Sequence, residues 1–169
     1  MKYRRFIYLA FLFILFQQVQ AQEAKFKALF MYNFTKYLEW PSTKQSGDFV
    51  IGIYGSSPII DELGIIAQKK RVGAQPIIVK QISSSSEFNK CNILFLPENR
   101  SSKLNEVVSI TGKSGTVIIT DKEGLAKQGA GLNYININGK QSFEINRKNL
   151  EEQGVKINSV LLSLGNVVE

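Results

Sequence analysis

The sequence predicts an α/β protein: a mainly parallel sheet with flanking helices, arranged as a Rossmann-like three-layer sandwich, plus an antiparallel edge hairpin. Two observations predict this fold. Four short apolar runs bounded by turn residues alternate with segments of helical pattern, which is typical of parallel strands buried on both faces. After residue 131 the pattern changes to alternating apolar and polar residues on both sides of Asn138-Gly139, a strong hairpin signal.

The N-terminus has the pattern of a signal peptide covering residues 1–21. Lys2, Arg4 and Arg5 precede the apolar run Phe6–Phe16, and Val19-Gln20-Ala21 suits cleavage after Ala21. The run is about eleven residues long, whereas a membrane span needs about twenty, so an uncleaved anchor is the weaker alternative. We therefore expect an exported protein in which residues 22–169 form a single domain.

The first element of that domain is a helix expected over residues 23–40. Phe26, Phe30 and Phe34 recur at helical spacing, and Pro41 disfavours helical geometry at the residue before it. The polar face of this helix is narrow. Such a helix is either deeply packed or covered on a second side by a partner.

The remaining elements follow in order. Strands are expected over residues 49–54, 76–82, 93–96 and 116–120. Helical segments are expected from Pro58 to residue 70, at a short turn capped by the serines of 83–86, and over 101–110, and residues 121–129 form a loop. The hairpin pairs 132–137 with 141–145, and two helical segments, 147–153 and 158–165, complete the chain. Val160, Leu161 and Leu164 give the last segment an apolar stripe.

Composition excludes several classes of site. The chain has no histidine, so it has no Ser-His-Asp or Cys-His triad and no histidine-ligated metal. Its one cysteine, Cys91, excludes an internal disulfide and is either a buried apolar residue or an intermolecular bridge. Loss of the leader removes three positive charges and lowers the net charge from +7 to +4, with the basic residues scattered. We expect no enzyme, no cofactor, no metal and no nucleic-acid partner.

Several segments resemble one known family. The segment 27–41, KALFMYNFTKYLEWP, resembles the opening signature of the YfiR family, and matching segments follow in order at 49–54, 71–73, 91–96, 131–134 and 143–146. The resemblance covers nearly all of the predicted domain. An aromatic helix ending in Trp-Pro is the most specific part of it.

The resemblance implies a periplasmic α/β regulator that does not catalyse a reaction. In the best-known systems the YfiR protein binds the periplasmic domain of an inner-membrane diguanylate cyclase and represses it, and an outer-membrane lipoprotein sequesters the repressor. Cyclic di-GMP then rises and favours biofilm growth. Some members carry paired cysteines, and the solitary Cys91 means that control by an internal disulfide cannot be transferred to this chain.

The first helix is the predicted partner-binding surface, with Phe26, Phe30, Asn33 and Tyr37 as candidate residues. Asn33 is either a residue hydrogen-bonded locally or an amide that orients a ligand. The apolar side chains cover more of the helix than one sheet face would hide, which predicts a homodimer. A charge at Phe30 or Met31 is then expected to dissociate it. The competing expectation is that Val160, Leu161 and Leu164 cover this helix within one chain.

A small-ligand-binding protein is the alternative function. Gly55, Ser56 and Ser57 follow the first strand, and Arg100 follows the third, so all four belong at the edge where open α/β sheets bind ligands. No glycine-rich phosphate motif supports this interpretation, and an ordinary turn is the competing one. Asp121 and Glu123 are two loop carboxylates and by themselves weak evidence for a cation site.

Overall fold

The computed structural model describes residues 20–169. The predicted signal peptide, residues 1–21, lies outside the described part apart from its last two residues, which are helical. Among residues 20–169 no helix has the length and apolar character needed to cross a membrane.

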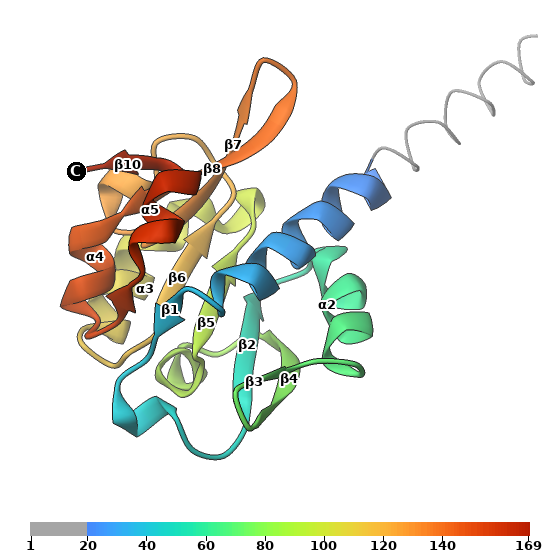
Figure 1. Ribbon diagram of the computed structural model, residues 1–169, viewed down its shortest axis with the longest axis vertical. Helices are drawn as coiled ribbons and strands as arrows, with labels where there is room; N and C mark the ends of the chain where they lie inside the picture. Colours follow the sequence, from blue (N-terminus) through green and yellow to red (C-terminus); the bar gives the residue numbers. More distant parts are fainter. Residues whose placement is uncertain (1–19) are drawn as a thin grey trace, which may run out of the picture.

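The core of the fold is an eight-stranded sheet with the order β10-β8-β7-β6-β5-β2-β4-β3. Neighbouring strands β4-β2-β5-β6-β7 run parallel, which confirms the predicted parallel sheet. Figure 1 shows the sheet with helices in front of it and behind it. The strands of this sheet are β2 (Phe49–Tyr54), β3 (Arg71–Val72), β4 (Gln75–Ile82), β5 (Ile93–Leu96), β6 (Val117–Thr120), β7 (Leu132–Ile137), β8 (Lys140–Asn146) and β10 (Asn166–Val168).

The predicted hairpin forms between β7 and β8, which pair antiparallel from Leu132–Ile145 out to Ile137–Lys140. Asn138 and Gly139 both have positive φ, 52° and 80°, as a two-residue hairpin turn requires. The tip of the hairpin projects beyond the body of the molecule (Figure 1). Strand β10 pairs parallel with β8 and adds one further strand outside the hairpin, which the sequence pattern did not indicate.

Two hydrophobic clusters, one on each face of the sheet, make the fold a three-layer sandwich. One face carries an N-terminal helix (residues 20–34) together with α2 (Ile59–Ala67), α4 (Arg147–Glu152) and α5 (Ser159–Leu164). The other face carries α3 (Leu104–Thr111) and the 3₁₀ helix η2 (Ser85–Lys90). Residues of one strand alternate between the clusters, as Phe95 and Leu96 of β5 do, because successive side chains of a strand point to opposite faces. The short connecting 3₁₀ helices are η1 (Ser42–Lys44), η3 (Glu98–Lys103) and η4 (Ala126–Gln128).

The first helix is shorter than the sequence predicts. It ends at residue 34, a turn follows, and β1 (Leu38–Glu39) pairs antiparallel with β9 (Lys156–Ile157) in a second, two-stranded sheet. Distant partners end it: Asn158 N donates to Tyr37 O at 2.9 Å, and Trp40 Nε1 donates to the Asn92 carbonyl at 3.0 Å. These tertiary hydrogen bonds override the local helical pattern, which Pro41 would have ended only at residue 40.

Candidate functional site

A cleft of about 860 Å³ opens at the carboxyl edge of the parallel strands and is lined by residues from the start of the N-terminal helix and from the β7–β8 hairpin. We call it the edge cleft. Asp121, the residue directly after β6, lines this cleft. Open α/β sheets bind ligands at the same edge. Its ionisable lining is mainly acidic, with five carboxylates against two lysines: Glu23, Glu98, Asp121, Glu123 and Glu144, with Lys27 and Lys122.

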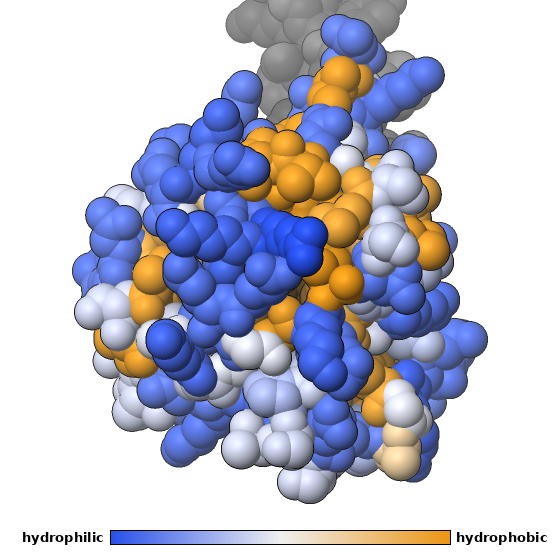
Figure 2. All heavy atoms as spheres, turned by 60° about the vertical axis from the view of Figure 1, so that its left-hand side comes forward, coloured by the Kyte–Doolittle hydropathy of each residue, from blue (hydrophilic) through white to orange (hydrophobic). Residues whose placement is uncertain are grey.

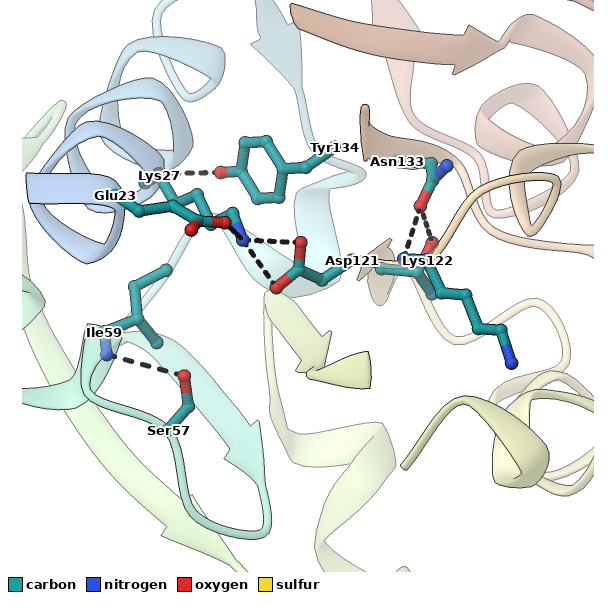
Figure 3. Close-up of polar contacts among 9 residues, drawn as sticks. Glu23, Lys27, Ser57, Ile59, Asp121, Lys122, Asn133 and Tyr134 are labelled. Atoms are coloured by element: carbon teal, nitrogen blue, oxygen red, sulfur yellow. Dashed lines mark hydrogen bonds and ion pairs between the residues drawn. The ribbon is translucent and has the colours of Figure 1, made fainter. Parts of the chain in front are cut away.

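A partly buried ion pair joins the N-terminal helix to this edge of the sheet. Lys27 Nζ lies 2.7 Å and 2.8 Å from the two carboxylate oxygens of Asp121, and it also donates to Glu23 one turn earlier in its helix. We call Glu23, Lys27 and Asp121 the Lys27 charge cluster (Figure 3). The Tyr134 hydroxyl, on β7, donates to the Lys27 backbone carbonyl at 2.7 Å. The lysine is therefore fixed at both its side chain and its backbone.

The two partners of the ion pair experience different surroundings. Burial works against the Lys27 ammonium, but hydrogen bonds and attraction from Asp121 and Glu23 outweigh it and raise the pKa of Lys27. Burial raises the pKa of Asp121 as well, and repulsion from Glu23 and Glu98 adds to this, although Lys27 opposes it. The raised pKa values mean that the charged form of Lys27 is favoured, whereas the charged form of Asp121 is disfavoured. The cause is that Lys27 lies beside two carboxylates, whereas Asp121 shares a single ammonium and faces other carboxylates.

The loop that carries Asp121 is held by a buried asparagine. Asn133 Oδ1 accepts from the Thr120 hydroxyl at 2.7 Å and from the Lys122 backbone N–H at 3.3 Å. Its amide nitrogen donates to Glu144 Oε2 on β8 at 2.9 Å. These contacts fix the direction in which the chain leaves β6, and thus the position of the Asp121 carboxylate.

The sequence interpretation missed the Lys27 charge cluster, although a signal for it was present. Lys27 lies on the same side of the helix as Ala24, Met31 and Phe34, all of which are buried. A lysine on a buried stripe needs a partner, and Glu23 at i−4 is one. Asp121 could not have been identified as the second partner, because it comes from a loop 94 residues away.

The predicted ligand residues come together only in part. Arg100 lies over the ring of Tyr54, and its Nε would be 2.9 Å from a Cβ on Gly55, so the loops after β2 and β5 do meet. Ser57 Oγ accepts weakly from Ile59 N at 3.5 Å at the start of α2, and Ser56 is exposed. None of these four predicted residues lines the edge cleft. Their role in binding a ligand stays a prediction.

An apolar groove of about 220 Å³ lies between the N-terminal helix and α5. Three of the predicted partner-binding residues, Phe30, Asn33 and Tyr37, line it, and the fourth, Phe26, stacks on Phe30 with ring centroids 4.2 Å apart. Asn33 accepts a hydrogen bond from Lys36 Nζ at 2.8 Å, in agreement with the first of the two alternatives for it, and a role in orienting a ligand stays a prediction. The other lining residues are Phe34, Phe143, Leu161 and Leu164.

Large apolar side chains remain exposed around the apolar groove. Leu29 is 49% exposed on the helix, and Val160 and Leu164 are 46% and 58% exposed on α5. Figure 2 shows apolar side chains gathered close to the N-terminal helix on this side of the molecule. Leu161, in contrast, is buried against the core. The last helix therefore covers the first one only partly.

Two further expectations concern reactive and metal-binding groups. Cys91 is fully buried beneath the sheet, as expected for an apolar residue, and this position does not suit an intermolecular bridge. Within residues 20–169, no group of three or more Asp, Glu, Cys or His side chains is placed to hold a metal ion. Asp121 pairs with Lys27 instead of forming a cation site with Glu123.

Comparison with known proteins adds a family and a fold. A family model described as YfiR/HmsC-like matches residues 24–166, which is almost the whole described chain. No curated protein is similar enough to this chain to count as a relative.

Two solved structures share the fold at low sequence identity. One is the ABC domain in complex with L-Trp from Streptococcus pneumonia, with 18% identity and a TM-score of 0.51. The other is a conserved domain protein from Vibrio cholerae O1 biovar El Tor, with 13% identity and a TM-score of 0.53. Each match covers 72% of this chain but only 55% of the other, so the chain spans about half the length of these structures.

Proposed function

Because the chain belongs to the YfiR/HmsC-like family of periplasmic regulatory proteins, we propose that it binds the periplasmic domain of an inner-membrane sensor or diguanylate cyclase and represses it. Export through a signal peptide cleaved after Ala21 would bring it to that compartment. Cyclic di-GMP synthesis and biofilm growth are the processes under its control. An outer-membrane lipoprotein that competes for the same surface would relieve the repression.

The apolar groove is the observation that carries this proposal. Four aromatic side chains and the exposed Leu164 line the groove, and this is the composition of a protein–protein contact centre. Exposed apolar area of this kind in a monomer usually marks an interface. The partner's own anchor residue would be an aromatic or aliphatic side chain, because the groove offers little except apolar contact and the Asn33 amide.

The groove can be tested with matched substitutions of exposed leucine and isoleucine. Leu164→Asp places a charge in the lining of the groove, and Leu29→Asp places one on the N-terminal helix, one turn before the lining residue Asn33. Ile65→Asp places a charge on α2 at a similar exposure of 50%. In cells we expect the two groove variants to raise cyclic di-GMP toward the level of a deletion strain, while Ile65→Asp stays at the wild-type level. Pull-down from envelope extracts should recover a membrane sensor with wild type and Ile65→Asp only. Unchanged cyclic di-GMP on deletion would refute the proposal.

The edge cleft favours ligand binding as a second function. Its size suits a small molecule, and its excess of carboxylates favours a cationic one. The Streptococcus structure holds an amino acid, L-Trp, which makes amino acids the first class to screen. We expect arginine or a polyamine to raise the unfolding temperature more than glutamate does. Equal shifts for all amino acids, or none, would leave only the partner-binding function.

A further inference from the structure

Strand β7 is longer than its parallel neighbour β6, so part of its backbone has no strand beside it. Strand β6 ends at Thr120, which pairs with Asn133 of β7. Strand β7 continues to Ile137 and is paired with β8 over its whole length on the other side. Among residues 20–169, no strand pairs with residues 134–137 on the side of β6. We call this side of residues 134–137 the free edge, and it belongs to the projecting hairpin of Figure 1.

The geometry of the hairpin decides which backbone groups point to the free edge. Ile137 lies next to the two-residue turn, where the residues of the two strands exchange hydrogen bonds across the hairpin. The carbonyl of Gly131, an even number of residues earlier, also accepts across the hairpin, from Asn146 N at 2.9 Å. Backbone groups alternate in direction along a strand, so Tyr134 and Asn136 direct theirs away from β8.

The chain that follows β6 turns away from the free edge. A longer β6 would place the Lys122 N–H on the Tyr134 carbonyl, but this N–H donates to the Asn133 side chain at 3.3 Å instead. The Tyr134 carbonyl and both backbone groups of Asn136 are therefore available to another strand. Lysine or proline usually protects an exposed edge strand from such pairing, and the free edge, YINI, contains neither.

The edge cleft is bordered by the free edge, and its lining indicates which kind of strand would pair there. All four residues of the free edge line the cleft, and the side chain of Ile137 is 42% exposed. Five carboxylates and two lysines make up the charged lining. Cleavage after Ala21 would place a new ammonium beside Glu23, which still leaves five carboxylates against three cations. The cleft thus combines unpaired backbone groups, apolar side chains and an excess of negative charge.

We propose that the free edge binds an extended segment of a partner protein that is rich in lysine or arginine, and that this segment adds to the sheet as a strand beside β7. The proposal rests on the ligand-binding function of the edge cleft and names the class of its ligand. Hydrogen bonds to Tyr134 and Asn136 supply affinity, and the carboxylates of the cleft select a basic sequence. The free edge offers about 13 Å of strand, so the bound segment is about four residues long.

Peptide binding tests the proposal on the mature protein. The probe is a fluorescein-labelled hexapeptide of alternating lysine and valine, and its binding is followed by fluorescence anisotropy. We expect the same peptide with every backbone nitrogen methylated to bind about tenfold more weakly, because it keeps its charge but cannot donate to the carbonyls of the free edge. A peptide with glutamate in place of lysine should not bind measurably. Amide exchange at Asn136 should slow when the lysine peptide binds.

Substitutions at one residue separate the role of the backbone from that of the side chain. Asn136→Pro removes the outward N–H and should weaken binding about threefold to tenfold, because proline is tolerated on an edge strand but does not donate. Asn136→Ala keeps the N–H and should bind the peptide as the wild type does. Both variants lose the hydrogen bond that Asn136 Oδ1 accepts from Gly139 N, so this loss cancels in the comparison. Glu123→Gln in the cleft should also weaken binding, whereas Glu62→Gln on α2 should not.

Three results would overturn the proposal: the lysine peptide does not bind, the methylated peptide binds equally well, or exchange at Asn136 is unchanged in the complex. If the lysine peptide binds as expected while arginine and polyamines leave the unfolding temperature unchanged, the strand site stands and the small-molecule function fails. If only those small cations bind, the small-molecule function stands and the strand site fails.

Discussion

The guanidinium of Arg100 lies over the aromatic ring of Tyr54, with Cζ 5.3 Å from the ring centroid. This contact joins the 3₁₀ helix η3, which follows β5, to the last residue of β2. It also fills the space above Gly55, whose φ of 101° is in the region that favours glycine. Two of the residues predicted to bind a ligand, Gly55 and Arg100, thus pack against each other, and the arginine is partly engaged by an aromatic face.

Gly55→Ala is expected to destabilise the protein by about 1–3 kcal/mol, because the new Cβ would meet both a disfavoured φ and the Arg100 side chain. Gly64→Ala is the matched control. Gly64 lies within α2 with open space around it, and alanine there should stabilise by up to about 1 kcal/mol. Urea unfolding of the three proteins measures both effects. If Gly55→Ala left the free energy of unfolding unchanged, the loop would have to rearrange without an energetic cost.

Tyr134→Phe should cost about 1 kcal/mol in the free energy of unfolding. The variant keeps the buried ring, which lies among Phe34 and Phe95, and removes only the hydroxyl that donates to the Lys27 carbonyl. Tyr32→Phe serves as the control and should change stability little, because Tyr32 is half-buried on the N-terminal helix that carries Lys27. Chemical denaturation gives the comparison. Loss of several kcal/mol would instead point to a hydrogen-bond network larger than the one described.

The sequence predicted the sheet better than it predicted the edge cleft. The strand at 93–96 and the hairpin at Asn138-Gly139 were found because their signals are local: a short apolar run and a turn that needs positive φ. The sequence predicts the end of the first helix at residue 40 instead of 34. The helix ends early because the residues after it pair with β9, and the paired residues Glu39 and Lys156 are 117 positions apart in the sequence. The Asp121 partner of Lys27 escaped prediction for the same reason. Local patterns carry no information on which loop meets which helix.

The Cys91 thiol should be almost inert in the folded protein. Burial raises its pKa to about 11 from an ordinary 9.0, so at about pH 8 the thiolate fraction falls about a hundredfold, and the side chain is fully buried as well. We expect negligible reaction with a chromogenic disulfide reagent in buffer and complete reaction in urea. Rapid labelling of the native protein would contradict the burial described here.

The same shift predicts a loss of stability in alkali. The folded protein holds the Cys91 proton more tightly than the unfolded chain, so the associated stability is complete below pH 9 and is lost as the pH rises toward 11. Tyr134, whose pKa burial also raises, should contribute in the same direction. Cys91→Ala should therefore show a shallower decline of the urea midpoint above about pH 9 than the wild type does. Parallel declines in the two proteins would assign the alkaline loss to other groups.

The exposed apolar side chains around the apolar groove predict that the mature protein forms a homodimer when no sensor is bound, in which the second copy occupies the surface proposed above to bind the sensor. Leu161 of α5 packs into the core, but Leu29, Val160 and Leu164 stay about half exposed, so the competing expectation of complete cover within one chain is met only in part. Two-fold pairing through one self-complementary patch is the commonest way to bury such a surface. Light scattering at micromolar concentration should then give the mass of two chains.

Substitutions can separate this interface from the core. Leu164→Asp should yield a monomer with the wild-type urea midpoint, and Ile65→Asp should remain a dimer. The sequence interpretation also named Met31 as an interface position, but Met31 is fully buried in the core, so a charge there should unfold the domain instead of dissociating it. A strictly monomeric mass at all concentrations would exclude the dimer. The apolar groove would then be left open for a different protein, and Leu164→Asp would change only the binding of that protein.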